Sequence, residues 1–466
     1  MFDISKFLSH PKALVVAPAG YGKTHFIVEA VKFCSGKSLI LTHTHAGVAS
    51  LRQKLNKEKV DPGKYNLETI SSFAQKYVHA YVAPEKIPIQ EEQEQYFKFI
   101  IMHATEIFLK KIFQEVIRKT YTGIFVDEYQ DCSQSHHAMI LAISQDIPLR
   151  VLGDPLQGIF NFNEPLVDFD ADLNNFYKVE LTTPWRWQQS NPQLGIDLHN
   201  IRNCIVTNNI INWKKITSIQ YFNASKDTPQ GIIQQRNRCV YGILKGISNE
   251  DLLIISSQVS ARGVRLKLAQ QLGGRFQLIE AIDDKNFYLL ASTLDNLSIS
   301  SFYDKFREIC LILFNKTEIN KWLGENRLKS KRNGFEQNYL LPLKEIIASL
   351  KEDNLCMKMY EAIECIKSFP KIHTFVHEQL YNILAALKIA HNESMPVLYA
   401  MKQIRNLYRS QGRSVPHYAI GTTLLTKGLE FDNVLVLNPA EMDSKHFYVA
   451  ITRARKRLFI YQENFK

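Results

Sequence analysis

One stretch near the start of the chain constrains the fold more than any other. The apolar run 13–17 has the composition of a buried strand, and it leads directly into APAGYGKT at residues 17–24. Apolar residues then recur at helical spacing over residues 26–33. A strand, a glycine-rich turn and a helix in this order are the context that a phosphate-binding loop requires, because backbone N–H groups and the helix N-terminus hold the anion.

The side chains in this loop predict how a nucleotide would be held. Lys23 would neutralise the β- and γ-phosphates, and the Thr24 hydroxyl would bind Mg²⁺. Ala19, Gly20 and Gly22 would supply the surrounding backbone. The alternative is a chance Gly-Lys-Thr in a loop, which the flanking strand and helix make the weaker interpretation.

A pair of carboxylates follows a second apolar run. Residues 123–126 end in Asp127 and Glu128. A buried parallel strand delivers side chains to the carboxyl edge of a sheet, where ligands bind in open α/β folds. In an NTPase the first carboxylate holds Mg²⁺ and the second orients the attacking water. A strand that ends in a solvated acidic turn is the alternative, and the phosphate loop weighs against it.

Polar residues at other predicted strand ends suggest contacts to a nucleic-acid strand. Thr42 and His45 follow the apolar run 38–42, and Thr69 and Phe73 open another helix. The alternatives are helix capping for the polar residues and a core position for Phe73. Gln157 lies just beyond the strand 149–152, where it would reach from the γ-phosphate toward the neighbouring groove.

Composition narrows the class of protein. The 466 residues exceed a single ordinary domain, and a net charge of +11 favours a polyanionic partner. The seven cysteines form no CxxC pair, which argues for a reducing compartment and against a zinc ribbon or iron–sulfur site. We see no signal peptide and no membrane-spanning stretch, so we expect a cytoplasmic protein without a membrane partner.

Eight stretches together resemble the superfamily 1 helicases of the UvrD/Rep type, and they occur in that family's order. They are APAGYGKT (17–24), THTHAGVASL (42–51), TISSFA (69–74), VDEYQD (126–131), VLGDPLQGIF (151–160), LTTPWR (181–186), TKGLEF (426–431) and YVAITRARKRL (448–458). VDEYQD and YVAITRAR are specific, whereas THTHAG and TISSF alone would be weak. The resemblance spans nearly the whole chain.

The resemblance implies an α/β fold with two RecA-like parallel-sheet domains, ATP and Mg²⁺ between them, and helical insertions in each. It places domain 1A at 1–80 and 119–181, a small 1B-like insertion at 81–118, domain 2A at 182–282 and 411–466, and a helical 2B-like insertion at 283–410.

The resemblance also implies roles for individual residues. Those for catalysis are Glu128 as base, Gln157 as γ-phosphate sensor, and Arg186 and Arg453 as arginine fingers. Those for the nucleotide and its Mg²⁺ are Ala19, Gly20, Gly22, Lys23, Thr24, Asp127, Trp185 on adenine and Glu430 on the ribose. Those for nucleic acid are Thr42, His45, Thr69, Phe73, Phe162 and Thr422.

Two functions of different classes follow. The first is an ATP-dependent helicase or translocase that moves on single-stranded DNA, 3′→5′ by family resemblance, and opens tailed duplexes. The second is an NTPase subunit that senses DNA or nucleotides and regulates a partner nuclease, as in Gabija-like anti-phage pairs. The sequence leaves open an RNA track, the pathway and the oligomeric state. It also leaves open the base selectivity, since no Gln-containing motif precedes the phosphate loop.

Overall fold

The chain divides into two compact units, one of residues 1–232 with 426–466 and one of residues 233–425. The structure is a computed structural model. It describes residues 4–88, 93–160, 164–224, 228–257, 262–279, 285–325, 327–329, 334–374, 377–411 and 416–463.

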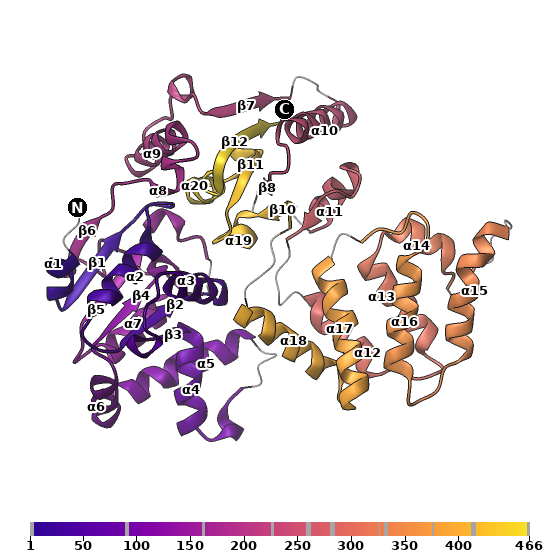
Figure 1. Cartoon of the computed structure of the whole chain (residues 1–466), viewed down its shortest axis with the longest axis horizontal. Coiled ribbons are helices and arrows are strands. Elements are labelled where there is room, and N and C mark those ends of the chain that lie inside the picture. Colours follow the sequence, from indigo (N-terminus) through magenta and orange to yellow (C-terminus); the bar gives the residue numbers. More distant parts are fainter. Residues whose placement is uncertain are drawn as a thin grey trace. The chain divides into compact units, whose positions relative to one another are not determined.

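The first unit is organised around a six-stranded parallel sheet with the order β3-β2-β4-β5-β1-β6 (Figure 1). Its strands are β1 (Lys12–Val16), β2 (Ser38–Thr42), β3 (Tyr65–Thr69), β4 (Gly123–Val126), β5 (Leu149–Gly153) and β6 (Tyr177–Glu180). The central strands β2, β4 and β5 are buried along their whole length, which explains why they appear in the sequence as continuous apolar runs.

Helices connect these parallel strands, as parallel pairing requires. They are α1 (Ile4–Ser9), α2 (Lys23–Phe33), α3 (His45–Lys57), α4 (Ile70–Tyr81), α5 (Gln93–Phe108), α6 (Lys111–Thr120) and α7 (Gln134–Ile143). Short 3₁₀ turns complete the connections: η1 (Pro62–Lys64), η2 (Pro84–Lys86), η3 (Tyr129–Asp131) and η4 (Pro155–Gln157). The apolar faces of α4, α5, α6 and α7 join the strands in one core.

The rest of the first unit brings the C-terminal segment beside the residues that follow β6. It comprises α8 (Trp185–Gln188), α9 (Pro192–Val206), η5 (Trp213–Lys215), β7 (Ile219–Asn223), β11 (Phe431–Leu437), η6 (Pro439–Glu441), α20 (Ser444–Ile451) and β12 (Ala454–Gln462). Strand β12 pairs in parallel with both β7 and β11. Indole Nε1 of Trp187 donates to the carbonyl of Ala454 at 2.8 Å, which fixes α8 against the start of β12.

The second unit combines three strands with a helical body. Strand β10 pairs in parallel with both β8 and β9. The elements are β8 (Leu252–Ser256), α11 (Arg262–Gln271), β9 (Gln277–Leu278), α12 (Lys285–Asp295), α13 (Phe302–Leu313), α14 (Lys316–Trp322), α15 (Gly334–Ala348), α16 (Leu355–Lys367), α17 (His377–Glu393), α18 (Val397–Gln411) and β10 (Tyr418–Thr422). Helices α10 (Pro229–Gly246) and α19 (Thr423–Thr426) lie at the two unit boundaries.

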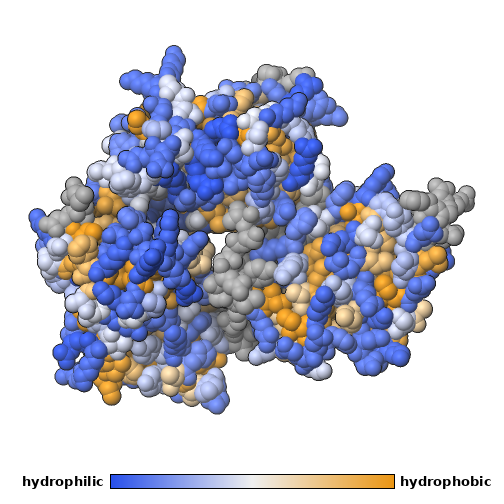
Figure 2. Space-filling model, viewed as in Figure 1, coloured by the Kyte–Doolittle hydropathy of each residue, from blue (hydrophilic) through white to orange (hydrophobic). Residues whose placement is uncertain are grey.

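Helices α12–α18 share a core of their own, which includes Phe302, Phe306, Trp322 and Met359 (Figure 1). The predicted α/β class with two parallel sheets is confirmed, and the four-part domain division stays a prediction. In the described ranges no helix combines the length and the apolar character needed to cross a membrane. The face seen in Figure 2 is mostly hydrophilic, with hydrophobic residues between.

Candidate active site

The predicted catalytic and nucleotide residues line one cavity of about 480 Å³ in the first unit. The walls come from the loop between β1 and α2, from α3, from the residues after β4, from η4 and α8, from the segment before β11 and from the residues after α20. The lining includes Ala19, Gly20, Gly22, Lys23, Thr24, Asp127, Glu128, Gln157, Trp185, Arg186, Glu430 and Arg453. Residues from seven separate motifs therefore meet in one place.

The phosphate loop has the backbone that its sequence predicts. Gly20 and Gly22 have φ of +77° and +87°, in the left-handed region that favours glycine. A Cβ on Gly20 would lie 2.8 Å from the Trp187 ring and 2.9 Å from Cβ of Arg186. At the other side of the loop, the Ala19 N–H donates to the Tyr448 hydroxyl at 3.3 Å. The loop is thus shaped by packing as well as by backbone preference.

Lys23, the first residue of α2, lies at the base of the cavity. Its side chain is 9% exposed, and its ammonium is 3.3 Å from Oε2 of Glu128. Burial lowers the pKa of Lys23, but Glu128, Asp154 and Asp127 outweigh it and raise the pKa above the ordinary value. The lysine is therefore charged at neutral pH.

Asp127 and Glu128 end β4 with different electrostatic environments. Burial and the adjacent Glu128 raise the pKa of Asp127 to about 7. Burial would also raise the pKa of Glu128, but Lys23, Lys427 and Gln130 lower it to about 2. Glu128 is thus ionised at neutral pH. A further cation beside Asp127 would lower the pKa of Asp127 and favour its ionised form.

Gln157 and Arg453 form a buried polar pair on the opposite wall. The Arg453 guanidinium donates to Oε1 of Gln157 at 3.3 Å and to the carbonyl of Val449 at 2.9 Å. Nε2 of Gln157 in turn donates to Oδ2 of Asp154 at 3.0 Å. Burial and the nearby Arg186 lower the pKa of Arg453 to about 10, which leaves it a cation at neutral pH.

Arg186 and Glu430 form an ion pair at the cavity edge. The Arg186 guanidinium also donates to the Thr452 carbonyl at 2.6 Å, and its backbone N–H donates to the Gly20 carbonyl at 3.0 Å. Trp185 is 60% exposed, and its ring lies against Gly22, where an added Cβ would be 3.2 Å from Cδ1. Both predicted contacts to the nucleoside thus border the phosphate loop.

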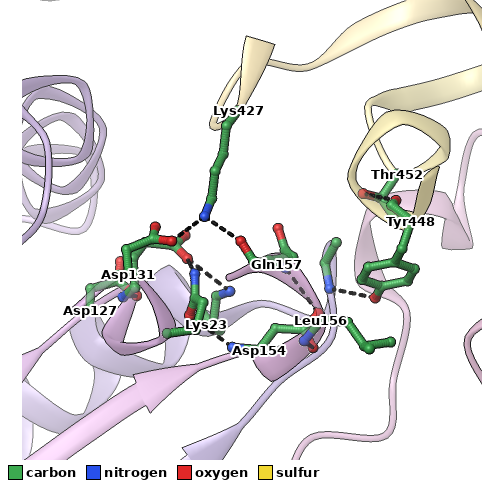
Figure 3. A network of polar contacts seen from close by, with 12 residues as sticks. Lys23, Asp127, Asp131, Asp154, Leu156, Gln157, Lys427, Tyr448 and Thr452 are labelled. Atoms are coloured by element: carbon green, nitrogen blue, oxygen red, sulfur yellow. Dashed lines mark hydrogen bonds and ion pairs between the residues drawn. The ribbon is translucent and has the colours of Figure 1, made fainter. Parts of the chain in front are cut away.

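Lys427 belongs to the TKGLEF stretch, and the sequence predicts no role for it. Its ammonium pairs with the Asp131 carboxylate and donates to the backbone carbonyl of Gln157, as Figure 3 shows. It also lies 4.8 Å from the centroid of the Phe160 ring. Asp131 and Lys427 are 296 positions apart, so sequence spacing gave no signal for this pair.

Three of the residues predicted for nucleic acid lie near the carboxyl edge of the first sheet, where Thr42 and Thr69 pair in register. Thr42 ends β2 and is fully buried, and His45 begins α3. Thr69 is 4% exposed and its hydroxyl caps α4 by accepting the N–H of Ser72. Thr422 ends β10 in the second unit and is buried. Phe162 lies outside the described residues.

Phe73 corrects one prediction. It is 2% exposed and its ring packs on Phe108, with 5.7 Å between the centroids. The position is a core position because α4 turns this residue toward α5, and a ring buried there does not stack on a base. The core alternative therefore holds for Phe73.

The cavity residues fit a nucleotide and Mg²⁺. The left-handed glycines leave a cradle that a Cβ would fill, and α2 begins at Lys23 with its N-terminus toward that cradle. The Thr24 hydroxyl and the Asp127 carboxylate are hard oxygen ligands of the type that Mg²⁺ prefers.

Comparison with known proteins gives two kinds of match. The model of the UvrD/REP helicase N-terminal domain matches residues 87–179. The Gabija protein GajB of Bacillus cereus (strain VD045) is 22% identical over 391 residues, covering 79% of this chain and 69% of GajB.

Two viral helicases were matched among solved structures. Arterivirus nonstructural protein 10, a helicase in complex with DNA, has 11% identity and a TM-score of 0.37, over 98% of this chain and 63% of that one. The PRRSV helicase has 11% identity and a TM-score of 0.35, over 98% and 54%. The chain thus covers less than two thirds of the length of these viral proteins.

The family match and the bacterial relative agree with the motifs from which the resemblance was first drawn. The family match covers the strand that carries Asp127 and Glu128 and the turn that carries Gln157. The chain is thus similar to UvrD/REP helicases over residues 87–179 and to GajB over 391 residues.

Proposed function

We propose that this protein is an ATP-dependent DNA translocase and helicase that moves 3′→5′ on single-stranded DNA and couples ATP hydrolysis to strand separation. The observation that carries the proposal is the convergence of Lys23, Glu128, Gln157, Arg186 and Arg453 on one cavity. The polarity and the track are taken from the family resemblance.

The nucleotide would be held by the loop 18–24, with Lys23 at its β- and γ-phosphates. Mg²⁺, held by Thr24 and Asp127, would supply charge neutralisation for phosphoryl transfer. Glu128, ionised at neutral pH, would orient and deprotonate a water molecule. Lys23 has to release Glu128 for this, since the two are an ion pair in the structure.

Arg186 and Arg453 would stabilise the charge that develops on the transferred phosphoryl group. An arginine finger is worth about 10³–10⁵ in rate. Both arginines belong to segments that also contact the phosphate loop or the Gln157 turn. A change in the distance between these segments would therefore change turnover, which is how hydrolysis would be coupled to movement.

The first experiment is steady-state ATP hydrolysis with and without single-stranded DNA. We expect stimulation by DNA, loss of hydrolysis in Lys23→Ala, and loss of hydrolysis with retained ATP binding in Glu128→Gln. A duplex with a single-stranded tail on either strand then tests polarity. Hydrolysis that persists in both variants would refute the mechanism.

A second function is supported by the name of the bacterial relative, a Gabija protein. In this second function the chain would be an NTPase subunit that senses DNA or nucleotides and regulates a partner nuclease in anti-phage defence. Weak hydrolysis by the isolated protein that rises when a co-purifying nuclease is added would support this function. Robust unwinding by the isolated protein would favour the first.

A further inference from the structure

Gln130 connects two parts of the cavity wall. It lies in η3, two residues after Glu128, and its side chain is buried. Its amide N–H donates to Oε2 of Glu128 at 2.5 Å. Its amide oxygen accepts the backbone N–H of Asp154 at 2.9 Å. One planar group thus ties Glu128, two residues after β4, to Asp154, the residue directly after β5.

The chemistry of the two partners explains why an amide occupies this position. An ionised carboxylate only accepts hydrogen bonds, and a backbone N–H only donates them. The connecting side chain must therefore donate at one end and accept at the other. A glutamine amide does both without carrying charge, whereas a glutamate in the same place would set two carboxylates against each other.

Two glycines make room for Gln130. A Cβ on Gly153 would lie 2.6 Å from Oε1 of Gln130 and 2.7 Å from Cζ of Phe169. A Cβ on Gly158 would lie 3.0 Å from the Gln130 carbonyl oxygen. Gly158 has φ of −73°, which any residue adopts, so space and not backbone conformation explains the glycine there.

The hydrogen-bonded chain continues beyond Asp154. Oδ2 of Asp154, a fully buried residue, accepts from Gln157 at 3.0 Å, and Gln157 accepts from Arg453 at 3.3 Å. Glu128 itself has φ of +54° and ψ of +44°, a conformation that non-glycine residues keep only where their surroundings hold it. Gln130 is the neighbour whose side chain contacts both the Glu128 carboxylate and the Asp154 backbone.

We infer that Gln130 is a positioning residue, whose amide orients the Glu128 carboxylate and links that orientation to the Asp154–Gln157 turn. The inference rests on the proposed function, because it concerns the carboxylate that would act on water. It adds a residue between the predicted base and the predicted γ-phosphate sensor, so that a shift of one displaces the other.

The test variant is Gln130→Glu, which keeps the acceptor for Asp154, removes the donor to Glu128 and adds a negative charge. We expect kcat for ATP at pH 6.5 to fall roughly 10- to 100-fold, with KM changed less than about threefold. A fall in kcat without a matching rise in KM separates an effect on the positioned carboxylate from weaker nucleotide binding.

The matched control is Gln114→Leu, which removes another buried glutamine amide. Gln114 donates to the backbone carbonyl of Ala142, and it does not line the cavity. We expect this control to lower Tm and to leave kcat within about threefold of wild type. A kcat that falls equally in both variants would overturn the inference, because loss of stability alone would then explain the fall.

A double-mutant cycle in Tm, made with nucleotide-free protein, separates this inference from the proposed function. Glu128→Ala should relieve the charge repulsion that Gln130→Glu creates, so the two Tm changes should depart from additivity by about 2 °C or more. Additive changes overturn the inference whether or not the wild type hydrolyses ATP. If the wild type does not hydrolyse ATP, the proposed function is overturned. The double-mutant cycle then tests the inference by itself. In an active protein, an unchanged kcat in Gln130→Glu also overturns it.

Discussion

The buried pair of Lys427 and Asp131 makes a prediction whose magnitude depends on pH. Their side chains are 8% and 2% exposed. Burial raises the pKa of Asp131 to about 7 although Lys427 lowers it. Lys427→Met removes the cation that lowers the Asp131 pKa, so the carboxyl of the variant keeps its proton to a higher pH than in the wild type. At pH 8.5, about 1.5 pH units above the wild-type pKa, the linked loss of unfolding free energy is about 2 kcal/mol. For a unit of this size we expect a fall in Tm of roughly 4–8 °C.

The sign of the pH effect follows from the raised pKa. Asp131 binds its proton more tightly in the folded protein than in the unfolded chain, where its pKa is near 3.8. When Asp131 is protonated, the folded protein needs no cation beside it. The loss of unfolding free energy in Lys427→Met should therefore shrink to under about 1 kcal/mol at pH 6. The deficit should grow again as the pH rises above about 7.

The assay is thermal unfolding of wild type, Lys427→Met, Asp131→Asn and the double variant at pH 6 and pH 8.5. The double variant should regain most of the stability, since neither charge is left alone. Lys445→Met is the control, because Lys445 is an exposed lysine in the same C-terminal segment and should cost under about 0.5 kcal/mol. A deficit that is equal at both pH values would refute the reasoning.

Three further predictions test other parts of the site. Gly20→Ala should lower Tm by several degrees and weaken ATP binding, because its Cβ would lie 2.8 Å from the Trp187 ring at a φ of +77°; a Tm equal to wild type would contradict this packing. Arg453→Lys should lower kcat about 10³-fold with less effect on ATP affinity, since an ammonium cannot reproduce its bonds to Gln157, Val449 and Leu429; turnover within tenfold of wild type would count against a finger role. Phe162→Ala, predicted from sequence, should weaken single-stranded DNA binding by about 1–3 kcal/mol in a fluorescence anisotropy titration, and unchanged affinity would exclude base stacking.

Elements with a strong local signal were predictable from sequence. The fully buried strands β2, β4 and β5 appear in the sequence as continuous apolar runs. The glycine-rich turn before α2 was predictable because a phosphate-binding loop requires glycines between a strand and a helix. Strands β3 and β7 were missed because they are only partly buried, with mixed patterns in place of an apolar run.

The residues of the site also divide into those whose roles follow from their neighbours in sequence and those whose partners are distant in sequence. Lys23, Asp127 and Glu128 follow from motifs that need only their neighbours in sequence. Gln130 belongs to VDEYQD and Lys427 to TKGLEF, but their partners Asp154 and Asp131 lie in other motifs of the chain. No spacing rule predicts such contacts, since they depend on which strands the sheet places side by side.

The charges in the cavity bear on how a polyanion would bind. Lys23 pairs with Glu128 and Arg186 pairs with Glu430, so two of the cations predicted for the nucleotide already have carboxylate partners. Under the proposed function a triphosphate must compete for both cations, and each exchange frees a carboxylate that the reaction is expected to use: Glu128 for water and Glu430 for the ribose. Lys427 differs, because its carboxylate partner is 2% exposed and the same ammonium also contacts the Gln157 backbone. We therefore expect Lys23 and Arg186 to exchange their carboxylate partners for phosphate oxygens during turnover. We expect the ion pair of Lys427 and Asp131 to persist and to keep this part of the cavity wall in place.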